Sequence, residues 1–261
     1  MSINNVEKFR AKMARGEVAI GIVIGFSDPQ VSELAADAGY DFTWIDMEHG
    51  ALTLPIALGH VMACRGTDTA PLIRVPSHDP VLIKPIIELF PAGVIVPRIQ
   101  TRKDVETAVA ACRYPPRGIR GYGPQRGVVA KGMDTQAYLK DPDSEPMVFV
   151  QIEDIEAVNN IDAILGVEGL AGICFGPNDL SGTMGKLGNP GAPEVVAKID
   201  LVCARCRKAG KLLGTSVGFS AASYRDWMAK GVQWISLNCD FANLYARSRA
   251  VLDEARAIRA E

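Results

Sequence analysis

The amino-acid sequence predicts an α/β fold, a single-domain (β/α)8 TIM barrel over residues 1–261, and three observations lead to it. Eight short runs rich in β-branched residues recur along the chain. Segments with helical periodicity separate most of them, which indicates a parallel sheet covered by helices. The length of 261 residues matches the roughly 250 residues of such a barrel. Eight repeats favour closure into a barrel over an open doubly wound sheet.

The predicted strands stand out by their apolar, β-branched composition. They are "VAIGIVIG" (18–25), "FTWIDM" (42–47), "PLIRV" (71–75), "GVIVP" (93–97), "MVFVQIE" (147–153), "LAGICFG" (170–176), "KLLGTSV" (211–217) and "VQWISLN" (232–238). Helical spacing follows in "DPQVSELAADAGY", "DPVLIKPIIELF", "TRKDVETAVAACR" and "IEAVNNIDAIL". No G-x-G-x-x-G follows the first strand, which counts against an open dinucleotide-binding sheet.

One long stretch, 113–146, opens with "RYPPRGIRGYGP". Its proline and glycine content predicts that it lacks regular structure. Because long loops in compact domains tend to be functional, we expect this one to contribute to function.

The charge pattern excludes some classes of partner. Lys and Arg total 28 against 30 Asp and Glu, so the net charge is −2, and the basic residues are scattered. This composition does not suit nucleic acid or an anionic membrane surface. The first residues lack the apolar core of a signal peptide, and no later run approaches the roughly 18 apolar residues of a membrane span. We therefore expect a cytoplasmic protein.

The six cysteines are spread along the chain, and an apolar content of 48% leaves no need for a disulfide framework. We expect reduced thiols. Cys203 and Cys206 form a C-x-x-C, but they lie in "EVVAKIDLVCARCRKAG", which has helical periodicity and no second ligand pair nearby. Helix packing explains this pair better than a zinc or redox site.

Polar side chains gather where the predicted strands end, and in a barrel these ends meet at the face that carries the active site. They are Asp46, Glu48 and His49 at the end of the second strand, Arg74 on the third, Arg98 behind Pro97 at the end of the fourth, Gln151 and Glu153 on the fifth, and Asp179 after the sixth. Gln151 and Glu153 share one side of their strand with Met147 and Phe149, although periodicity does not say whether that side faces the barrel interior. Together these residues favour catalysis over a structural role.

The residue types narrow the chemistry. Two carboxylates without a histidine cluster suit a hard divalent cation such as Mg²⁺ or Mn²⁺. Neither an H-E-x-x-H motif nor a Cys/His set for zinc occurs. The lysines fall in predicted helices and loops or at the start of the seventh strand, which disfavours Schiff-base chemistry. Metal-assisted carbonyl chemistry is therefore favoured over imine chemistry.

Five motifs occur in the order "IDMEH", "PLIRVPSHDPVLIK", "RYPPRGIRGYGP", "VQIE" and "GPNDLSGTMG". By these motifs the chain resembles the metal-dependent class II pyruvate aldolases, the group of 4-hydroxy-2-oxoheptanedioate aldolase and 2-keto-3-deoxy-rhamnonate aldolase in the aldolase/citrate lyase superfamily. The resemblance extends over nearly the whole chain.

The resemblance implies roles for the residues that match these motifs. Glu153 and Asp179 would hold a divalent metal, Mg²⁺, Mn²⁺ or Co²⁺. His49 would be the catalytic base, and Arg74 would stabilise an enolate. The residues that would seat the substrate are Gln151, Gly176, Pro177, Asn178 and Asp179.

Family members also carry an acid that orients the histidine, and two candidates compete for this role here. Asp46 lies three residues before His49 in the same turn, whereas Glu88, in "PIIELF", stands where an Asp is expected. The sequence leaves this choice open.

Further departures from the family pattern are Met47, where a small residue is frequent, Phe90-Pro91 at the entry to the fourth strand, and Arg98, where an apolar residue is common. They touch the acceptor side of the pocket, so the natural aldehyde does not follow from the sequence.

The implied activity is reversible cleavage of 4-hydroxy-2-oxoacids to pyruvate, or a close 2-oxoacid, and an aldehyde through a metal-stabilised enolate. One alternative is a malyl- or citramalyl-CoA-type lyase or another metal-enolate enzyme, although 261 residues leave little room for CoA. From a different class, a catalytically silent barrel could act as a scaffold.

The C-terminal stretch "DFANLYARSRAVLDEARAIRA" (240–260) is amphipathic beyond the need of a last barrel helix. Family members exchange this helix between subunits. The resemblance therefore implies a homo-oligomer, a hexamer.

Overall fold

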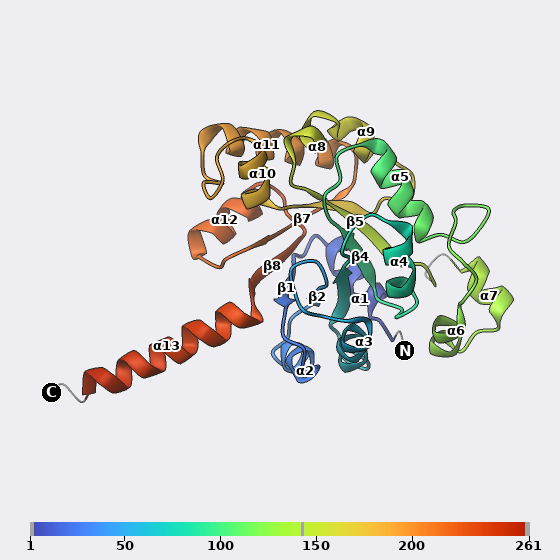
Figure 1. Cartoon of the computed structure of the whole chain (residues 1–261), viewed down its shortest axis with the longest axis horizontal. Helices are drawn as coiled ribbons and strands as arrows, with labels where there is room; N and C mark the ends of the chain where they lie inside the picture. The colour runs from blue at the N-terminus through green and yellow to red at the C-terminus, as the bar shows by residue number, and fades with distance from the viewer. Residues whose placement is uncertain (1–2, 142–143, 259–261) are drawn as a thin grey trace.

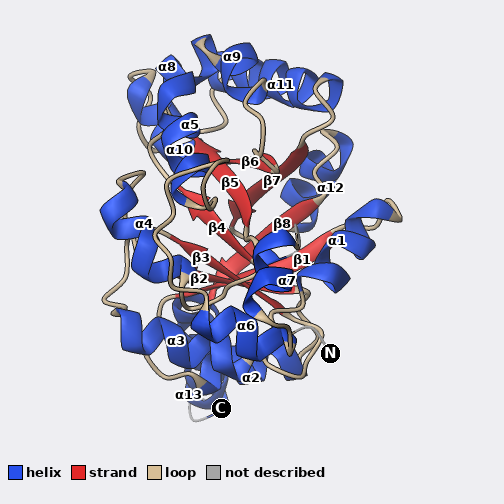
Figure 2. Ribbon diagram, turned by 90° about the vertical axis from the view of Figure 1, so that its right-hand side faces the viewer, coloured by secondary structure: helices blue, strands red, loops and turns tan. Residues whose placement is uncertain are grey.

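Eight parallel strands close into a barrel in the computed structural model, and helices surround it (Figures 1 and 2). The structure describes residues 3–141 and 144–258. The strands are β1 (Ala19–Ile24), β2 (Phe42–Asp46), β3 (Ala70–Arg74), β4 (Gly93–Val96), β5 (Met147–Ile152), β6 (Gly172–Phe175), β7 (Leu212–Val217) and β8 (Trp234–Cys239). They pair in sequence order, and β8 closes on β1. The predicted (β/α)8 barrel is confirmed, and the open sheet is excluded.

Each predicted run overlaps one strand, and no end differs by more than two residues. The parallel register sets the strand ends level with one another: Asp46 pairs with Arg74 across β2 and β3, and Gln151 pairs with Cys174 across β5 and β6. The polar strand ends therefore meet at one mouth.

The helices of the described residues cover the outside of the barrel and its lower end. They are α1 (Val6–Ala14), α2 (Gln30–Asp37), α3 (Leu54–Ala63), α4 (Pro80–Ile87), α5 (Arg102–Ala111), α6 (Gln125–Lys131), α7 (Thr135–Lys140), α8 (Ile155–Asn159), α9 (Ile161–Leu165), α10 (Pro177–Thr183), α11 (Pro193–Lys208), α12 (Ala221–Ala229) and α13 (Asp240–Ile258). Among these described helices, none combines the length and the apolar character that crossing a membrane requires.

The stretch 113–146 is more ordered than predicted, because it contains α6 and α7; residues 142–143 lie outside the described part. The turn-forming residues of this stretch lie at the ends of the helices and do not interrupt them. Gly132 ends α6 with a φ of 62°, and the Asp134 side chain caps α7 by accepting the Ala137 N–H at 2.9 Å. The expectation of an irregular stretch was wrong for these two segments.

The barrel interior is filled by aromatic rings at its lower half. Phe149 and Trp234 lie 4.6 Å apart between ring centroids, and Phe9 of α1 closes the lower end against Phe42 at 5.5 Å. A Cβ at Gly214 would lie 2.1 Å from the Trp234 ring, so only glycine leaves room for it. This packing blocks the lower end, and the upper end remains for chemistry.

The last helix, α13, leaves the barrel and extends away from it (Figure 1). Of its described residues only Asp240 is buried; its carboxylate accepts the N–H groups of Gly25 and Phe26 at 2.8 and 2.9 Å. The large apolar side chains that the helix exposes are Phe241, Leu244, Tyr245, Val251, Leu252 and Ile258.

All six cysteines are unpaired. Five are buried, including Cys203 and Cys206 on the inner side of α11, so the prediction of helix packing for this pair is confirmed. Burial raises the pKa of the Cys203 thiol to about 11 and that of Cys206 to about 12. Cys239, at the end of β8, is the one that is partly exposed.

Candidate active site

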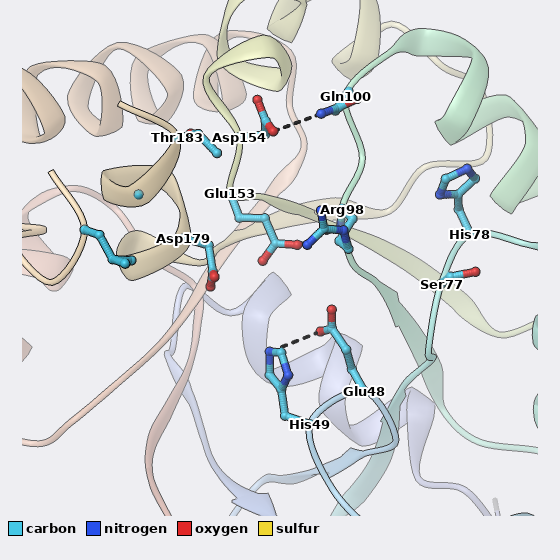
Figure 3. Close-up of a pocket in the computed structure, with 12 residues that line it drawn as sticks. Glu48, His49, Ser77, His78, Arg98, Gln100, Glu153, Asp154, Asp179 and Thr183 are labelled. Atoms are coloured by element: carbon cyan, nitrogen blue, oxygen red, sulfur yellow. Dashed lines mark hydrogen bonds and ion pairs between the residues drawn. The ribbon is translucent and has the colours of Figure 1, made fainter. Parts of the chain in front are cut away.

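The polar residues predicted at the strand ends do converge at the barrel mouth (Figure 3). A cavity of about 440 Å³ lies there, and a smaller one lies deeper, beside Arg74 and Gln151. The smaller cavity is also lined by Gly176, Pro177, Asn178 and Asp179, which the sequence predicted to seat the substrate.

Asp46 and Arg74 form a buried, two-point ion pair. The Arg74 Nε donates to Asp46 Oδ1 at 2.9 Å, and Nη2 donates to Oδ2 at 2.5 Å. Burial alone would raise the pKa of Asp46, but the hydrogen bonds and charge of Arg74 outweigh it and lower that pKa. Asp46 therefore stays charged and fixes the guanidinium, which also lies 5.5 Å from the Trp44 ring centroid.

The same guanidinium reaches two further side chains. Its Nη1 lies 3.0 Å from Glu48 Oε2 and donates to Gln151 Oε1 at 3.3 Å. Arg74 thus joins β2 to β5 across the mouth and places a cation in the lining of the smaller cavity.

Glu153 follows β5 and is 6% exposed. One carboxylate oxygen accepts the Gln151 Nε2 hydrogen at 2.7 Å, and the other accepts the Arg98 backbone N–H at 2.6 Å. A Cβ at Gly176 would lie 2.7 Å from Glu153 Oε2, so this position requires glycine. Gln151 and Glu153 therefore face the mouth, which answers the question that periodicity left open.

Burial raises the pKa of Glu153 to about 7; the Arg98 N–H and Arg74 act against this, and the charges of Glu48 and Asp179 add to it. Burial also raises the pKa of Glu48. The protein therefore balances the negative charge of Glu48 and Glu153 only in part, whereas Arg74 balances that of Asp46.

Glu153 and Asp179 lie on the same side of the pocket, and both carboxylates point into it (Figure 3). Across the described residues, no group of three or more His, Cys, Asp and Glu side chains is clustered as a metal site. Two protein carboxylates with open positions for water or substrate are what Mg²⁺ and Mn²⁺ sites commonly use.

His49 extends from the turn after β2, and its side chain is 65% exposed. Its Nε2 lies 3.7 Å from Glu48 Oε2 (Figure 3). Asp46 contacts His49 only through the backbone, by accepting its N–H at 3.3 Å. Glu88 is engaged elsewhere, since its Oε1 accepts the Arg120 Nε hydrogen at 3.1 Å.

The acid that reaches the imidazole is therefore Glu48, which the sequence placed at the strand end without giving it a role. The sequence did carry one signal for this contact: Glu48 and His49 are neighbours in the turn after β2, where adjacent side chains can approach each other. The orientation of the Glu48 side chain depends on Arg74, a residue 26 positions away, and no local pattern reports that contact.

The barrel and its charged mouth define an enzyme whose chemistry lies at the strand ends. The chain belongs to the HpcH/HpaI aldolase/citrate lyase family, whose model matches residues 20–245. It is an aldolase, a carbon–carbon lyase, as the sequence predicted.

Similar proteins agree with this family. The chain is 38% identical to a hydroxypyruvate/pyruvate aldolase of Pseudomonas aeruginosa over 80% of this chain and 78% of that protein. It is 32% identical to a 5-keto-4-deoxy-D-glucarate aldolase of Shigella dysenteriae over 94% and 95% of the two chains. The structure matches a family member from Burkholderia cenocepacia with a TM-score of 0.87 and 27% identity over 97% and 99% of the chains.

Proposed function

We propose that this aldolase cleaves 4-hydroxy-2-oxoacids reversibly to pyruvate, or a close 2-oxoacid, and an aldehyde, with a divalent cation as cofactor. The observation that carries the proposal is the group of acids Glu48, Glu153 and Asp179 in one pocket with His49. The names of the relatives, hydroxypyruvate/pyruvate aldolase and 5-keto-4-deoxy-D-glucarate aldolase, support a small oxoacid as the substrate.

The residues present fit such a cation. The raised pKa of Glu153, due first to burial and then to repulsion from Glu48 and Asp179, reflects negative charge that the protein does not balance. Glu153 and Asp179 would hold the cation as oxygen ligands. When bound, Mg²⁺, Mn²⁺ or Co²⁺ would act as a Lewis acid toward the keto oxygen of the substrate.

The oxoacid would lie in the smaller cavity between Arg74 and the Gly176–Asp179 turn. Arg74 is held there by Asp46 and Glu48, so its guanidinium is already oriented when negative charge develops on the keto oxygen. A preoriented cation lowers the free energy of the transition state without further reorganisation. Gln151, fixed between Arg74 and Glu153, would donate to or accept from the same substrate.

His49 would act as the general base. In the cleavage direction it takes the proton of the 4-hydroxyl, the C3–C4 bond breaks, and the aldehyde leaves. The bonding electrons form an enolate beside Arg74, which then takes up a proton at C3 to give the 2-oxoacid. An exposed imidazole with Glu48 at 3.7 Å suits this role, because the acid would stabilise the protonated ring.

An assay of pyruvate release from a 4-hydroxy-2-oxoacid tests this function. We expect release with Mn²⁺ or Mg²⁺, its loss in EDTA, and its recovery when metal is restored. Cleavage of a malyl- or citramalyl-CoA thioester in place of the oxoacid would support the rival lyase. Turnover of neither substrate under metal-replete conditions would leave the scaffold function.

We further propose that α13 is exchanged between copies of the chain in a homo-oligomer, a hexamer. The helix exposes a row of large apolar residues, including Phe241, Leu244 and Tyr245, at 60–63% of their surface. On the barrel, Ile20 of β1 and Leu237 of the adjacent strand β8 are only partly buried. Such apolar surfaces support contact with a second copy.

Light scattering at micromolar concentration tests the assembly. A hexamer mass supports it, and deletion of residues 244–261 should convert the hexamer to smaller species. A monomer of the full chain at this concentration would refute it.

A further inference from the structure

Trp44 of β2 lines the smaller cavity, although its side chain can neither coordinate a metal nor transfer a proton. It lies two residues before Asp46, so both side chains lie on the same side of the strand. Trp44 is only 1% exposed, and it shares the cavity lining with Arg74 and Gln151. Trp44 therefore belongs to the wall of this cavity as well as to the packed interior of the barrel.

The Arg74 guanidinium lies over the Trp44 ring. Its Cζ is 5.5 Å from the ring centroid, which is within the range of a cation–π interaction. The Trp44 ring also packs on Trp234, a fully buried residue, with the two centroids 5.9 Å apart and an interplanar angle of 32°. Because close packing on Trp234 limits its movement, the Trp44 ring offers the guanidinium a fixed surface.

More negative charge surrounds Arg74 than its guanidinium can balance. Asp46 accepts hydrogen bonds from Nε and Nη2, and Glu48 approaches Nη1 at 3.0 Å, so two carboxylates share one cation. A third acid would hold the guanidinium in place but would also repel an enolate. A neutral aromatic ring attracts the cation through its quadrupole and adds no net negative charge. Trp44 can thus fix the direction of Arg74 and leave its positive charge to the substrate.

We infer that Trp44 is a positioning residue, whose ring face holds the Arg74 guanidinium at the cavity so that the cation meets the keto oxygen on which the enolate charge develops. This inference rests on the proposed function, in which Arg74 stabilises the enolate. The indole N–H is not needed for it, because Nε1 has almost no exposed surface and no hydrogen-bond partner among the described residues. The ring face and the N–H can therefore be tested separately.

The first test measures exchange of the pyruvate methyl protons with D₂O by the Mn²⁺-loaded enzyme, a reaction that forms the enolate and requires no aldehyde. Trp44→Leu removes the aromatic face. We expect kcat for exchange to fall by about 2- to 30-fold, the range of a cation–π interaction. The KM for pyruvate should barely change, because the contact matters most once the enolate charge develops. Trp44→Phe keeps a ring face without the N–H and should recover most of the rate.

Oxalate, a dianion with the shape of the pyruvate enolate, supplies a readout that loss of packing alone would not move. Its inhibition constant should rise in Trp44→Leu by about the same factor by which kcat for exchange falls. Phe149→Leu is the matched control, because Phe149 is a fully buried ring of the barrel interior that lines neither cavity. This control should lower the melting temperature and leave exchange and oxalate inhibition unchanged.

A second series of variants keeps the volume of the side chain and so protects folding. Mono-, di- and trifluorinated tryptophan at position 44 progressively reduce the electron density of the ring face and leave its shape nearly intact. Exchange should slow with each added fluorine. A rate that does not depend on fluorination, or a Trp44→Leu enzyme with normal kcat and normal oxalate inhibition, overturns the inference. A Trp44→Phe enzyme as impaired as Trp44→Leu would do so too, because the ring face would then not be what matters.

Exchange by the wild type distinguishes failure of this inference from failure of the proposed function. If the Mn²⁺-loaded wild type does not exchange pyruvate protons, the proposed function fails and the inference fails with it. Wild-type exchange that does not respond to the changes at Trp44 overturns only the assignment of Trp44.

Discussion

Two acids at the same barrel mouth, Asp46 and Glu153, differ in how their charge is balanced. Asp46 is matched by Arg74 through two short hydrogen bonds, and its pKa is lowered despite burial. Glu153 receives only an amide and a backbone N–H, and burial raises its pKa to about 7. The matched acid orients other residues, whereas the unmatched acid is prepared for a cation that the chain itself does not supply.

This difference shows how a buried carboxylate that orients other side chains can be distinguished from one that binds a cation. A carboxylate that is paired with a cationic side chain of the protein contributes to the shape of the site. One whose pKa rises among like charges gains most from a metal ion.

The largest effect is expected for Glu153→Ala, which removes a proposed ligand of the cation. Metal-dependent turnover should be abolished, and calorimetry should show no tight Mn²⁺ binding. Glu156→Ala is the control, because Glu156 is an exposed acid on α8 and should leave both quantities unchanged. A Glu153→Ala enzyme that keeps its activity and its sensitivity to EDTA would exclude this ligand.

Replacing the proposed base comes next. His49→Ala should lower cleavage by roughly 10²- to 10⁴-fold, the range for loss of general acid–base catalysis. The melting temperature should barely change, since the side chain is 65% exposed and packs against little. Proton exchange of pyruvate should suffer less if Arg74 and the cation carry enolisation. The reverse pattern, normal turnover with reduced stability, would make His49 a structural residue.

The partner of His49 is the third test, and kinetics of three variants decide it. Glu48→Gln should lower turnover by about 10-fold, as for other partners that orient a functional histidine. Asp46→Asn would show the same kinetic defect if Asp46 polarises the ring through the turn. A defect confined to Glu88→Gln would assign the role to Glu88, which in this chain contacts Arg120.

For stability, Asp46→Asn should cost about 3 kcal/mol at neutral pH, because it removes one partner of a buried ion pair. The lowered pKa of Asp46 fixes the pH dependence. Its contribution is present above the unfolded pKa near 3.8 and is lost as the pH falls through the folded value, so wild type and variant should converge in acid. Urea unfolding at several pH values measures this, and a difference that persists at low pH would contradict it.

The smallest effect has the opposite sign. Glu153 has a folded pKa of about 7 against an ordinary 4.5, so its stabilising contribution is present below pH 4.5 and is lost as the pH rises through 7. In EDTA, the melting temperature of Glu153→Gln relative to wild type should therefore rise by about 3–5 °C between pH 5 and pH 8. A relative shift of zero would mean that Glu153 is not strained by its neighbours.

The fold was predictable from sequence because hydrophobic strands and amphipathic helices carry periodic signals. The register, the strand order and the convergence of Asp46, Arg74 and Glu153 follow from barrel closure once eight repeats are recognised. The helices α6 and α7 were missed because the proline and glycine content of 113–146 predicted a stretch without regular structure.

Contacts between distant residues were not predictable. The pairing of Glu48 with His49 depends on Arg74 from another strand. Amphipathicity indicated an exposed apolar face on 240–260, of which 259–260 lie outside the described part. The amphipathic pattern did not indicate where this helix lies relative to the barrel, and the structure shows that α13 extends away from it.

The distribution of the cysteines gives this chain a built-in labelling site. Five thiols are buried, and burial raises the pKa of Cys64 and Cys112 to about 11, so little thiolate is available for a maleimide at neutral pH. Cys239 is partly exposed, and its sulfur accepts the Ala242 N–H at 3.4 Å in the first turn of α13. A fluorophore attached without any mutation would therefore sit at the joint between barrel and final helix, where its emission would report the movement of that helix.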